Sequence, residues 1–186
     1  AGSHTDTLAG AGALDRSLLR AAWQRRGVDG FTYGLDVVRA GAAFEPGLGF
    51  LRRRDFTSAG TRLAYGWRPG EASPVLTHGP ALEASAFARN QDGTVETVEI
   101  IPRWDMTLKA GHGFSLIGSY THENLATGFG LPDGAAVPAG SYDFAGARFV
   151  YETPPGTVLG AGAMVAAGTF YDGRLIGGET TLPGQS

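Results

Sequence analysis

The chain has 186 residues, and 30 of them are glycine, about twice the usual share of roughly 7 %. Charged residues make up 18 %, below the roughly 25 % of an average soluble domain. The apolar share of 42 %, with 10 Phe, 6 Tyr and 3 Trp, excludes a polar disordered chain. The net charge of −3 gives no electrostatic reason to expect nucleic acid as a partner. Because cysteine is absent, a disulfide scaffold, a thiolate metal site and a cysteine nucleophile are all excluded.

The first residues, 1–6, do not predict a targeting segment. Residues 1–6 have no initiator Met, no basic region and no apolar run, so no signal peptide is predicted. We interpret residues 1–186 as a single domain, a mature or excised fragment of a longer barrel, with residues 1–15 irregular. The longest uncharged run, residues 153–171, contains a Pro-Pro pair and several glycines. A spanning helix needs about 20 predominantly apolar residues, so none is predicted here.

The first part of the chain combines an ambiguous segment with an alternating one. Ser17–Gln24 is compatible with one or two helical turns, or with a strand that leads into the turn Gly27–Gly30. Apolar residues then recur at every second position, as is typical of a strand, at Phe31, Tyr33, Leu35 and Val37. Glu45–Gly47 indicates a tight connection and Pro69–Gly79 a longer loop.

The clearest period-two pattern runs from Thr94 to Leu108, directly after the hairpin signal Asp92-Gly93. One side of this predicted strand carries the polar residues Thr97, Glu99, Arg103 and Asp105. The other side carries an apolar stripe of Val98, Ile100, Pro102, Trp104, Met106 and Leu108. The alternation predicts one dry face and one wet face. Because proline cannot donate to a strand ladder, a local bulge is expected at Pro102.

The same alternation continues toward the C-terminus. It occurs in Phe114–Tyr120 and in Tyr142–Tyr151, on either side of a loop rich in Gly, Pro and Ala over Ala126–Gly140. Pro154–Gly156 and Asp172-Gly173 are further turn signals. We expect roughly eight to ten strands of about 10 to 14 residues, against a usual mean of about 5 to 6. Long strands joined by short turns predict an all-β fold, an antiparallel up-and-down β-barrel or a part of one.

This pattern is compatible with two surroundings. In a soluble, lipocalin-like barrel the apolar stripe faces inward around an apolar ligand, whereas in an outer-membrane barrel it faces lipid and the lumen is polar. Three features favour the membrane: strands longer than the about 9 to 11 residues needed to cross, the low charged content, and aromatic residues near strand ends. These aromatic residues are Phe31, Tyr33, Trp67, Tyr120, Tyr142, Tyr151, Phe170 and Tyr171.

The membrane interpretation assigns roles to the two sides of the Thr94–Leu108 strand. The lumen-facing candidates are Thr97, Glu99, Arg103 and Asp105. The lipid-facing candidates are Val98, Ile100, Trp104, Met106 and Leu108. Charges that line a lumen can pair and stay hydrated, and they would tune the selectivity of a pore.

Four segments resemble one bacterial family of long exported proteins of unknown function. In chain order they are residues 43–56, 90–100, 138–144 and 170–174, which end in RRRDF, TVEI, SYDF and FYDGR. Members of that family pair an N-terminal β-sandwich, similar to carbohydrate-binding family nine, with a C-terminal outer-membrane-type barrel. The resemblance covers roughly residues 17–175 and implies that this chain is part of the barrel. It implies no catalytic residue and, without the sandwich, no carbohydrate site.

The histidines indicate no established chemistry. Their spacing matches no zinc pattern, at His4, His78, His112 and His122, so neither a metal nor a cofactor is expected. An outer-membrane lipid hydrolase with a Ser–His pair stays an alternative. However, Ser119 and His122 are three residues apart, as are His112 and Ser115, and such residues face opposite sides of a strand. No catalytic residue is assigned.

The densest charge cluster is Arg52, Arg53 and Arg54, followed by Asp55. It is a candidate for binding an anionic substrate or the phosphates of lipopolysaccharide, or else a solvated strand end whose arginines pair with carboxylates. Together these features predict a segment of a bacterial outer-membrane barrel, a pore or a membrane anchor in the cell envelope, rather than an enzyme. The expected partners are outer-membrane lipid and a saccharide or small solute.

Overall fold

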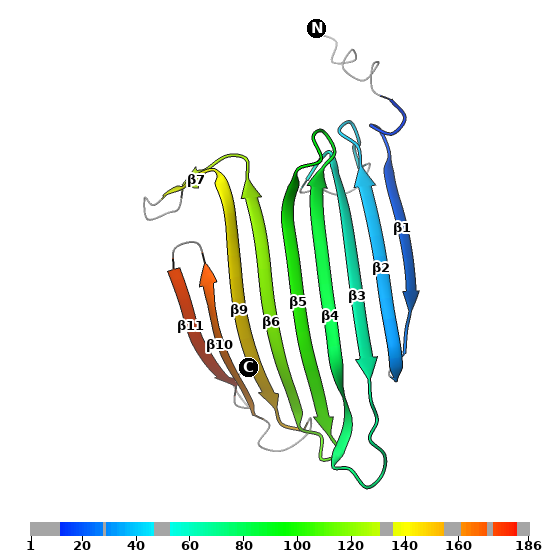
Figure 1. Ribbon diagram of the computed structural model, residues 1–186, viewed down its shortest axis with the longest axis vertical. Helices are drawn as coiled ribbons and strands as arrows, with labels where there is room; N and C mark the ends of the chain where they lie inside the picture. Colours follow the sequence, from blue (N-terminus) through cyan, green and yellow to red (C-terminus); the bar gives the residue numbers. More distant parts are fainter. Residues whose placement is uncertain are drawn as a thin grey trace.

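The computed structural model describes residues 12–27, 29–46, 53–130, 136–154, 161–170 and 173–181. They form one nine-stranded antiparallel sheet, in which each strand pairs with the next along the chain, and a separate two-stranded hairpin, β7–β8. Figure 1 shows the long strands side by side in a single layer. The predicted all-β, up-and-down antiparallel architecture is confirmed.

The strands of the main sheet are β1 (Leu18–Arg25), β2 (Gly30–Ala40), β3 (Phe56–Gly66), β4 (Val75–Arg89), β5 (Val95–Leu108), β6 (Gly113–Leu125), β9 (Gly140–Glu152), β10 (Gly162–Phe170) and β11 (Gly173–Thr181). The small hairpin consists of β7 (Phe129–Gly130) and β8 (Ala136–Val137) and lies within the predicted loop Ala126–Gly140. The predicted loop Pro69–Gly79 is shorter than expected, because β4 begins at Val75.

The ambiguous segment Ser17–Gln24 is resolved as a strand, β1. Each of its residues pairs with β2, with Trp23 opposite Leu35, so ladder hydrogen bonds outweigh a local helical preference. The turn between the two strands ends at Gly30, whose φ of 73° lies in the left-handed region that favours glycine. The hairpin predicted at Asp92-Gly93 joins β4 to β5, and Gly93 has a φ of 72°.

The bulge expected at Pro102 is not found. The register between β4 and β5 passes through Leu82 and Pro102 without a shift, and the irregularities lie instead at Val75/Thr77 and Phe87/Ala88. On the other side, β5 and β6 keep one register across Pro102. A Cβ on Gly118 would lie 3.1 Å from Pro102 Cγ. The proline ring therefore fits without a register shift because its neighbour on β6 has no side chain. The β5–β6 pairing is interrupted only at Ile101 and Pro102.

The sheet has almost no hydrophobic core. In the part of the chain that the structure describes, the buried hydrophobic residues are Ala40, Phe56 and Val137. Many large apolar side chains along the strands are exposed; Trp23 is 67 % exposed and Ile176 is 82 % exposed. Since no second layer of described residues covers either face, the described part of the fold leaves extensive apolar surface exposed.

The sheet is open at both edges. Nine strands that alternate in direction leave β1 and β11 running parallel, and within the described residues these two strands do not pair. A closed barrel in which all neighbours are antiparallel would therefore need an odd number of additional strands. Among the described residues, no helix is long and apolar enough to cross a membrane.

Candidate functional site

The register of β5 with β4 and β6 separates its side chains onto two faces. Ile100 lies opposite Ala84 on β4 and Tyr120 on β6. Trp104 lies opposite Pro80 and Leu116. By strand alternation, Val98, Met106 and Leu108 share this side, which we name the apolar face. Thr97, Glu99, Arg103 and Asp105 lie on the other side, which we name the polar face.

A band without charge crosses the apolar face. Strand alternation and the register place its Asp, Glu, Lys and Arg residues, in the described part of the strands, near the strand ends, at Arg25, Arg39, Asp143 and Arg174. The positions between them are occupied by apolar residues, glycine, threonine and aromatic residues. From Phe114 to Tyr120 this charge-free band extends for about 20 Å along the strand, at about 3.3 Å per residue.

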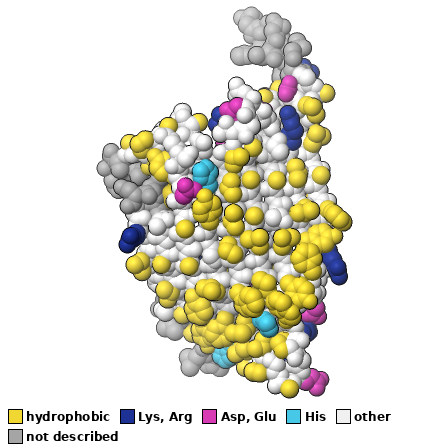
Figure 2. Space-filling view, in the orientation of Figure 1, with side chains coloured by type: hydrophobic (Ala, Val, Ile, Leu, Met, Phe, Trp, Pro, Cys, Tyr) yellow, Lys and Arg dark blue, Asp and Glu magenta, His cyan; other side chains and the backbone are white. Residues whose placement is uncertain are grey.

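Aromatic rings gather at one end of the charge-free band, where the turns after β1, β3 and β5 lie. Trp23 contacts Tyr33 with ring centroids 5.4 Å apart. The rings of Trp67, His78 and Trp104 form a triangle whose centroids are 5.4 to 5.8 Å apart. The row is completed by Phe31, Tyr65, Phe114, Phe149 and Tyr151. Figure 2 shows these hydrophobic side chains concentrated over the lower ends of the strands. We name this row the aromatic belt.

Polar contacts mark the opposite end of the charge-free band. Asp143 Oδ1 accepts a hydrogen bond from the Tyr120 hydroxyl at 2.6 Å and lies 2.8 Å from His122 Nδ1. His122 therefore has a carboxylate partner, whereas Ser119 lies on the polar face.

The second His–Ser pair lies near the aromatic belt. His112 contacts the Tyr151 hydroxyl at 2.9 Å, and the Ser115 hydroxyl donates to Asp105. Neither of the two His–Ser pairs considered in the sequence comes together.

On the polar face, several charged side chains are paired. Arg103 Nη2 lies 2.6 Å from Asp105 Oδ1, which also accepts a hydrogen bond from the Ser115 hydroxyl at 2.6 Å. Glu99 Oε2 accepts a hydrogen bond of 3.4 Å from Ser85. Glu99 is thus joined to β4 and Asp105 to β6 through polar contacts, which is compatible with a hydrated surface.

Two further ion pairs on the polar face were not predicted. Arg62 and Glu83 are opposite each other on β3 and β4, with 3.2 Å between their charged groups. Arg20 Nε lies 2.7 Å from Asp36 Oδ2. From the sequence, the alternation within each strand is sufficient to predict that each of these residues lies on the polar side. The pairing, however, depends on the register between strands, which one sequence does not reveal.

The arginine cluster is divided by the structure. Arg52 lies outside the described residues, and Arg54 is exposed. Arg53 donates to Thr97 Oγ1 at 3.0 Å, lies 3.6 Å from Glu96 Oε2, and stacks 4.8 Å from the centre of the Phe87 ring. Arg53 covers Thr97, which is only 8 % exposed. These contacts favour the second interpretation of the cluster, an arginine paired with a carboxylate at a strand end.

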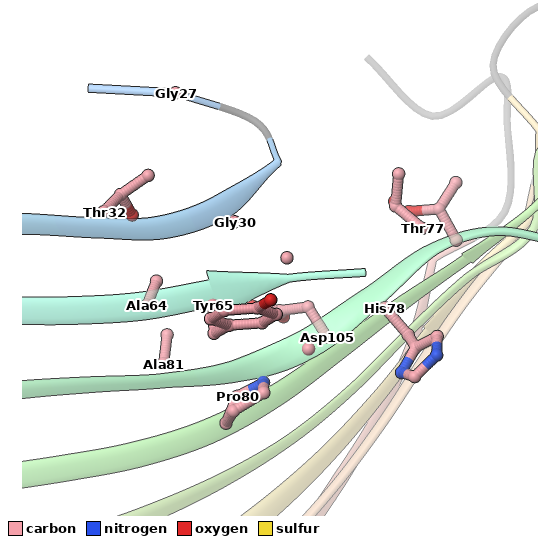
Figure 3. Close-up of a pocket in the computed structure, with 13 residues that line it drawn as sticks. Gly27, Gly30, Thr32, Ala64, Tyr65, Thr77, His78, Pro80, Ala81 and Asp105 are labelled. Atoms are coloured by element: carbon pink, nitrogen blue, oxygen red, sulfur yellow. The ribbon is translucent and has the colours of Figure 1, made fainter. Parts of the chain in front are cut away.

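The surface hollows open on the polar face. One of about 180 Å³ lies near the turns at the aromatic end, between Thr32, Ala64 and Thr77. In Figure 3 these three side chains lie on one side of the strands, and Pro80 and His78 on the other. Two larger hollows, of about 410 and 470 Å³, lie over the second half of the sheet. Hollows on this face indicate that the sheet curves toward its polar side.

Comparison with known proteins gives no further assignment. No family model matches the chain, and no curated protein or solved structure is significantly similar to it. The resemblance to the bacterial barrel family therefore stays a prediction. Within the described residues, no three His, Asp or Glu side chains come together in a way that could hold a metal ion.

Proposed function

We propose that this chain forms part of a β-barrel in a bacterial outer membrane, where it acts as a pore or as a membrane anchor. Its apolar face would contact lipid and its polar face would line the lumen. The single observation that carries the proposal is the charge-free band across a nine-stranded sheet that no other described element covers. No substrate is assigned by the band itself.

The size of the charge-free band supports a large apolar partner. Nine strands spaced about 4.8 Å apart are about 38 Å wide, and the band is about 20 Å long, which gives an area on the order of 800 Å². The largest apolar patch on a soluble monomer is about 300 to 600 Å². The apolar band of an outer-membrane barrel is about 25 Å tall and is flanked by aromatic girdles. The charge-free band is similar in length, and the aromatic belt and the Tyr120–Asp143 contact flank its two ends.

The curvature argues against the soluble alternative. A lipocalin-like barrel needs its apolar face on the concave side, around the ligand. Here the hollows lie on the polar face, and the paired arginines and carboxylates lie there too. A sheet that curves in this direction would enclose water and leave its apolar side outward, as lipid requires.

The proposal is tested first by whether folding needs an amphiphile. Far-UV circular dichroism of the refolded chain would be compared in plain buffer and in nonionic detergent micelles. We expect a strand signal only with micelles. A cooperative, monomeric β-fold in plain buffer would contradict the proposal and favour a soluble barrel.

A second measurement separates a pore from an anchor. After insertion of the full-length protein into planar lipid bilayers, single-channel conductance reports whether the lumen is open. Discrete conductance steps would support a pore. Stable insertion without conductance would restrict the role to that of an anchor.

A further inference from the structure

The second half of the polar face contains a hollow with apolar walls. It has a volume of about 410 Å³, within the range of about 300 to 1,000 Å³ for small-molecule pockets, and lies over β5, β6, β9, β10 and β11. Its bulky lining residues are Ile101, Ile117, Phe144 and Leu175. Such side chains are unexpected on a face whose other half carries the ion pairs Arg20–Asp36 and Arg62–Glu83.

Small residues form the floor of this apolar hollow. Ser119 lies opposite Gly146, Gly146 opposite Gly168, and Gly168 opposite Leu175. A Cβ on Gly168 would lie 3.0 Å from the Ala145 carbonyl oxygen and 3.2 Å from Gly146 Cα. The backbones of β9 and β10 therefore lie close together at the bottom of the hollow. Because Gly146 and Gly168 have no side chain, the hollow is deeper there.

Arg148 stands at the edge of the apolar hollow with its charge unpaired. It lies opposite Ile117 and Ala166, and it lines both the apolar hollow and the neighbouring one. Among the described residues, no carboxylate lies within ion-pair distance of it, whereas Arg62 and Arg103 on the same face each have a carboxylate partner.

We propose that this hollow binds a small organic monoanion with an apolar body, an ionised monocarboxylic acid. The carboxylate would accept two hydrogen bonds from the planar guanidinium of Arg148, and the apolar body would cover Ile101, Ile117 and Leu175. In the neighbouring hollow Asp105 is paired with Arg103, and Glu152 adds a negative charge that forms no ion pair among the described residues, so a second negative charge on the ligand would be repelled. The inference deepens the proposed function, since it names the class of solute that a lumen with this wall would hold.

The probe for this site is 4-(trifluoromethyl)benzoate, with 4-(trifluoromethyl)benzamide as its neutral counterpart. Binding to the full chain would be followed by fluorine NMR, because neither protein nor detergent contains fluorine. We expect a saturable shift of the benzoate signal and an affinity for the amide at least about tenfold weaker.

Three variants locate the binding. Arg148→Gln should weaken binding of the benzoate about tenfold and leave the amide unchanged. Ala166→Phe, which fills the hollow, should weaken both probes. Arg62→Gln is the matched control, an arginine of the same face that has a carboxylate partner, and it should change neither. Each variant is first checked for the wild-type strand signal.

The proposal is overturned by the absence of saturable benzoate binding to the folded chain, by equal binding of benzoate and amide, or by unchanged binding in either Arg148→Gln or Ala166→Phe. The titration is carried out in whichever solvent, buffer or micelles, gives the folded sheet. A chain that folds in plain buffer would contradict the membrane proposal and still allow the binding site to be tested.

Discussion

The two faces of the sheet share one backbone and differ in almost every other respect. Ile100 and Ile101 are chemically identical neighbours on β5, yet Ile100 lies in the charge-free band and Ile101 lines a hollow beside Arg103 and Arg148. On the polar face charges lie along the strands and several of them form ion pairs, whereas on the apolar face they are confined to the strand ends. The comparison teaches that the position of a residue in the strand alternation, rather than its local sequence, determines its surroundings.

The largest effect is expected from a charge placed in the charge-free band. Ile100→Arg should destabilise the chain in lipid vesicles by about 2 to 4 kcal/mol, the cost of a lipid-facing arginine near the bilayer midplane. Ile101→Arg, one residue further along, is the control and should cost far less because a hydrated face tolerates charge. Urea unfolding from vesicles measures both, and equal losses would mean that the two faces have the same surroundings.

The next effect concerns the close contact between β3 and β4 near the aromatic belt. A Cβ on Gly79 would collide with the carbonyl group of Tyr65 on β3. Gly79→Ala should therefore force the strands apart and cost about 1 to 3 kcal/mol. Gly177→Ala is the control, because nothing lies within 4 Å of its added Cβ. Thermal or urea unfolding in micelles compares the two, and a Gly79→Ala protein as stable as Gly177→Ala would contradict this packing.

A smaller effect should follow from removing a carboxylate of the polar face. Asp105→Asn leaves Arg103 without its ion pair, and for partly exposed groups such a loss is about 0.5 to 1 kcal/mol. If the lumen conducts, the exposed positive charge should also shift the ion selectivity toward anions. The reversal potential under a salt gradient measures that shift, with Asp143→Asn, on the apolar face, as the control. A selectivity that Asp105→Asn leaves unchanged would place Asp105 outside the conducting path.

The smallest effect should come from the β4–β5 turn. The backbone N–H of Thr94 donates to Asp92 and, together with its side chain and Arg89, lowers the pKa of that carboxyl below its ordinary value. A lowered pKa stabilises the folded state above the unfolded pKa, and this contribution is lost as the pH falls through the folded value. Below about pH 4, the difference in unfolding midpoint between the wild type and Asp92→Asn should therefore shrink. A difference that is constant from pH 7 to pH 3 would contradict this role.

The sequence predicted much of the fold because the dominant signal is local. Alternation along residues 94–108 was sufficient to separate Glu99 and Arg103 from Ile100 and Trp104, and the glycine at position 93 was sufficient to predict a hairpin. Alternation has a fixed period of two, so it is visible within a single strand.

What the sequence did not predict depends on contacts between strands. The bulge expected at Pro102 is absent because Gly118, 16 residues away, leaves space for the ring. The unpaired state of Arg148 and the pairing of Arg62 with Glu83 both follow from the register. Register is fixed by the whole sheet. In the same way, the segment Ser17–Gln24 is extended rather than helical because it pairs with β2.

The central claim is that the apolar face contacts lipid and the polar face does not. Because the chain has no cysteine, single cysteines can be introduced at Ile100 and at Glu99 and labelled with the environment-sensitive fluorophore NBD. In vesicles that contain a lipid with a quencher on its acyl chain, the label at position 100 should be quenched strongly and the label at position 99 only weakly. Equal quenching at the two positions, or stronger quenching at position 99, would contradict the account.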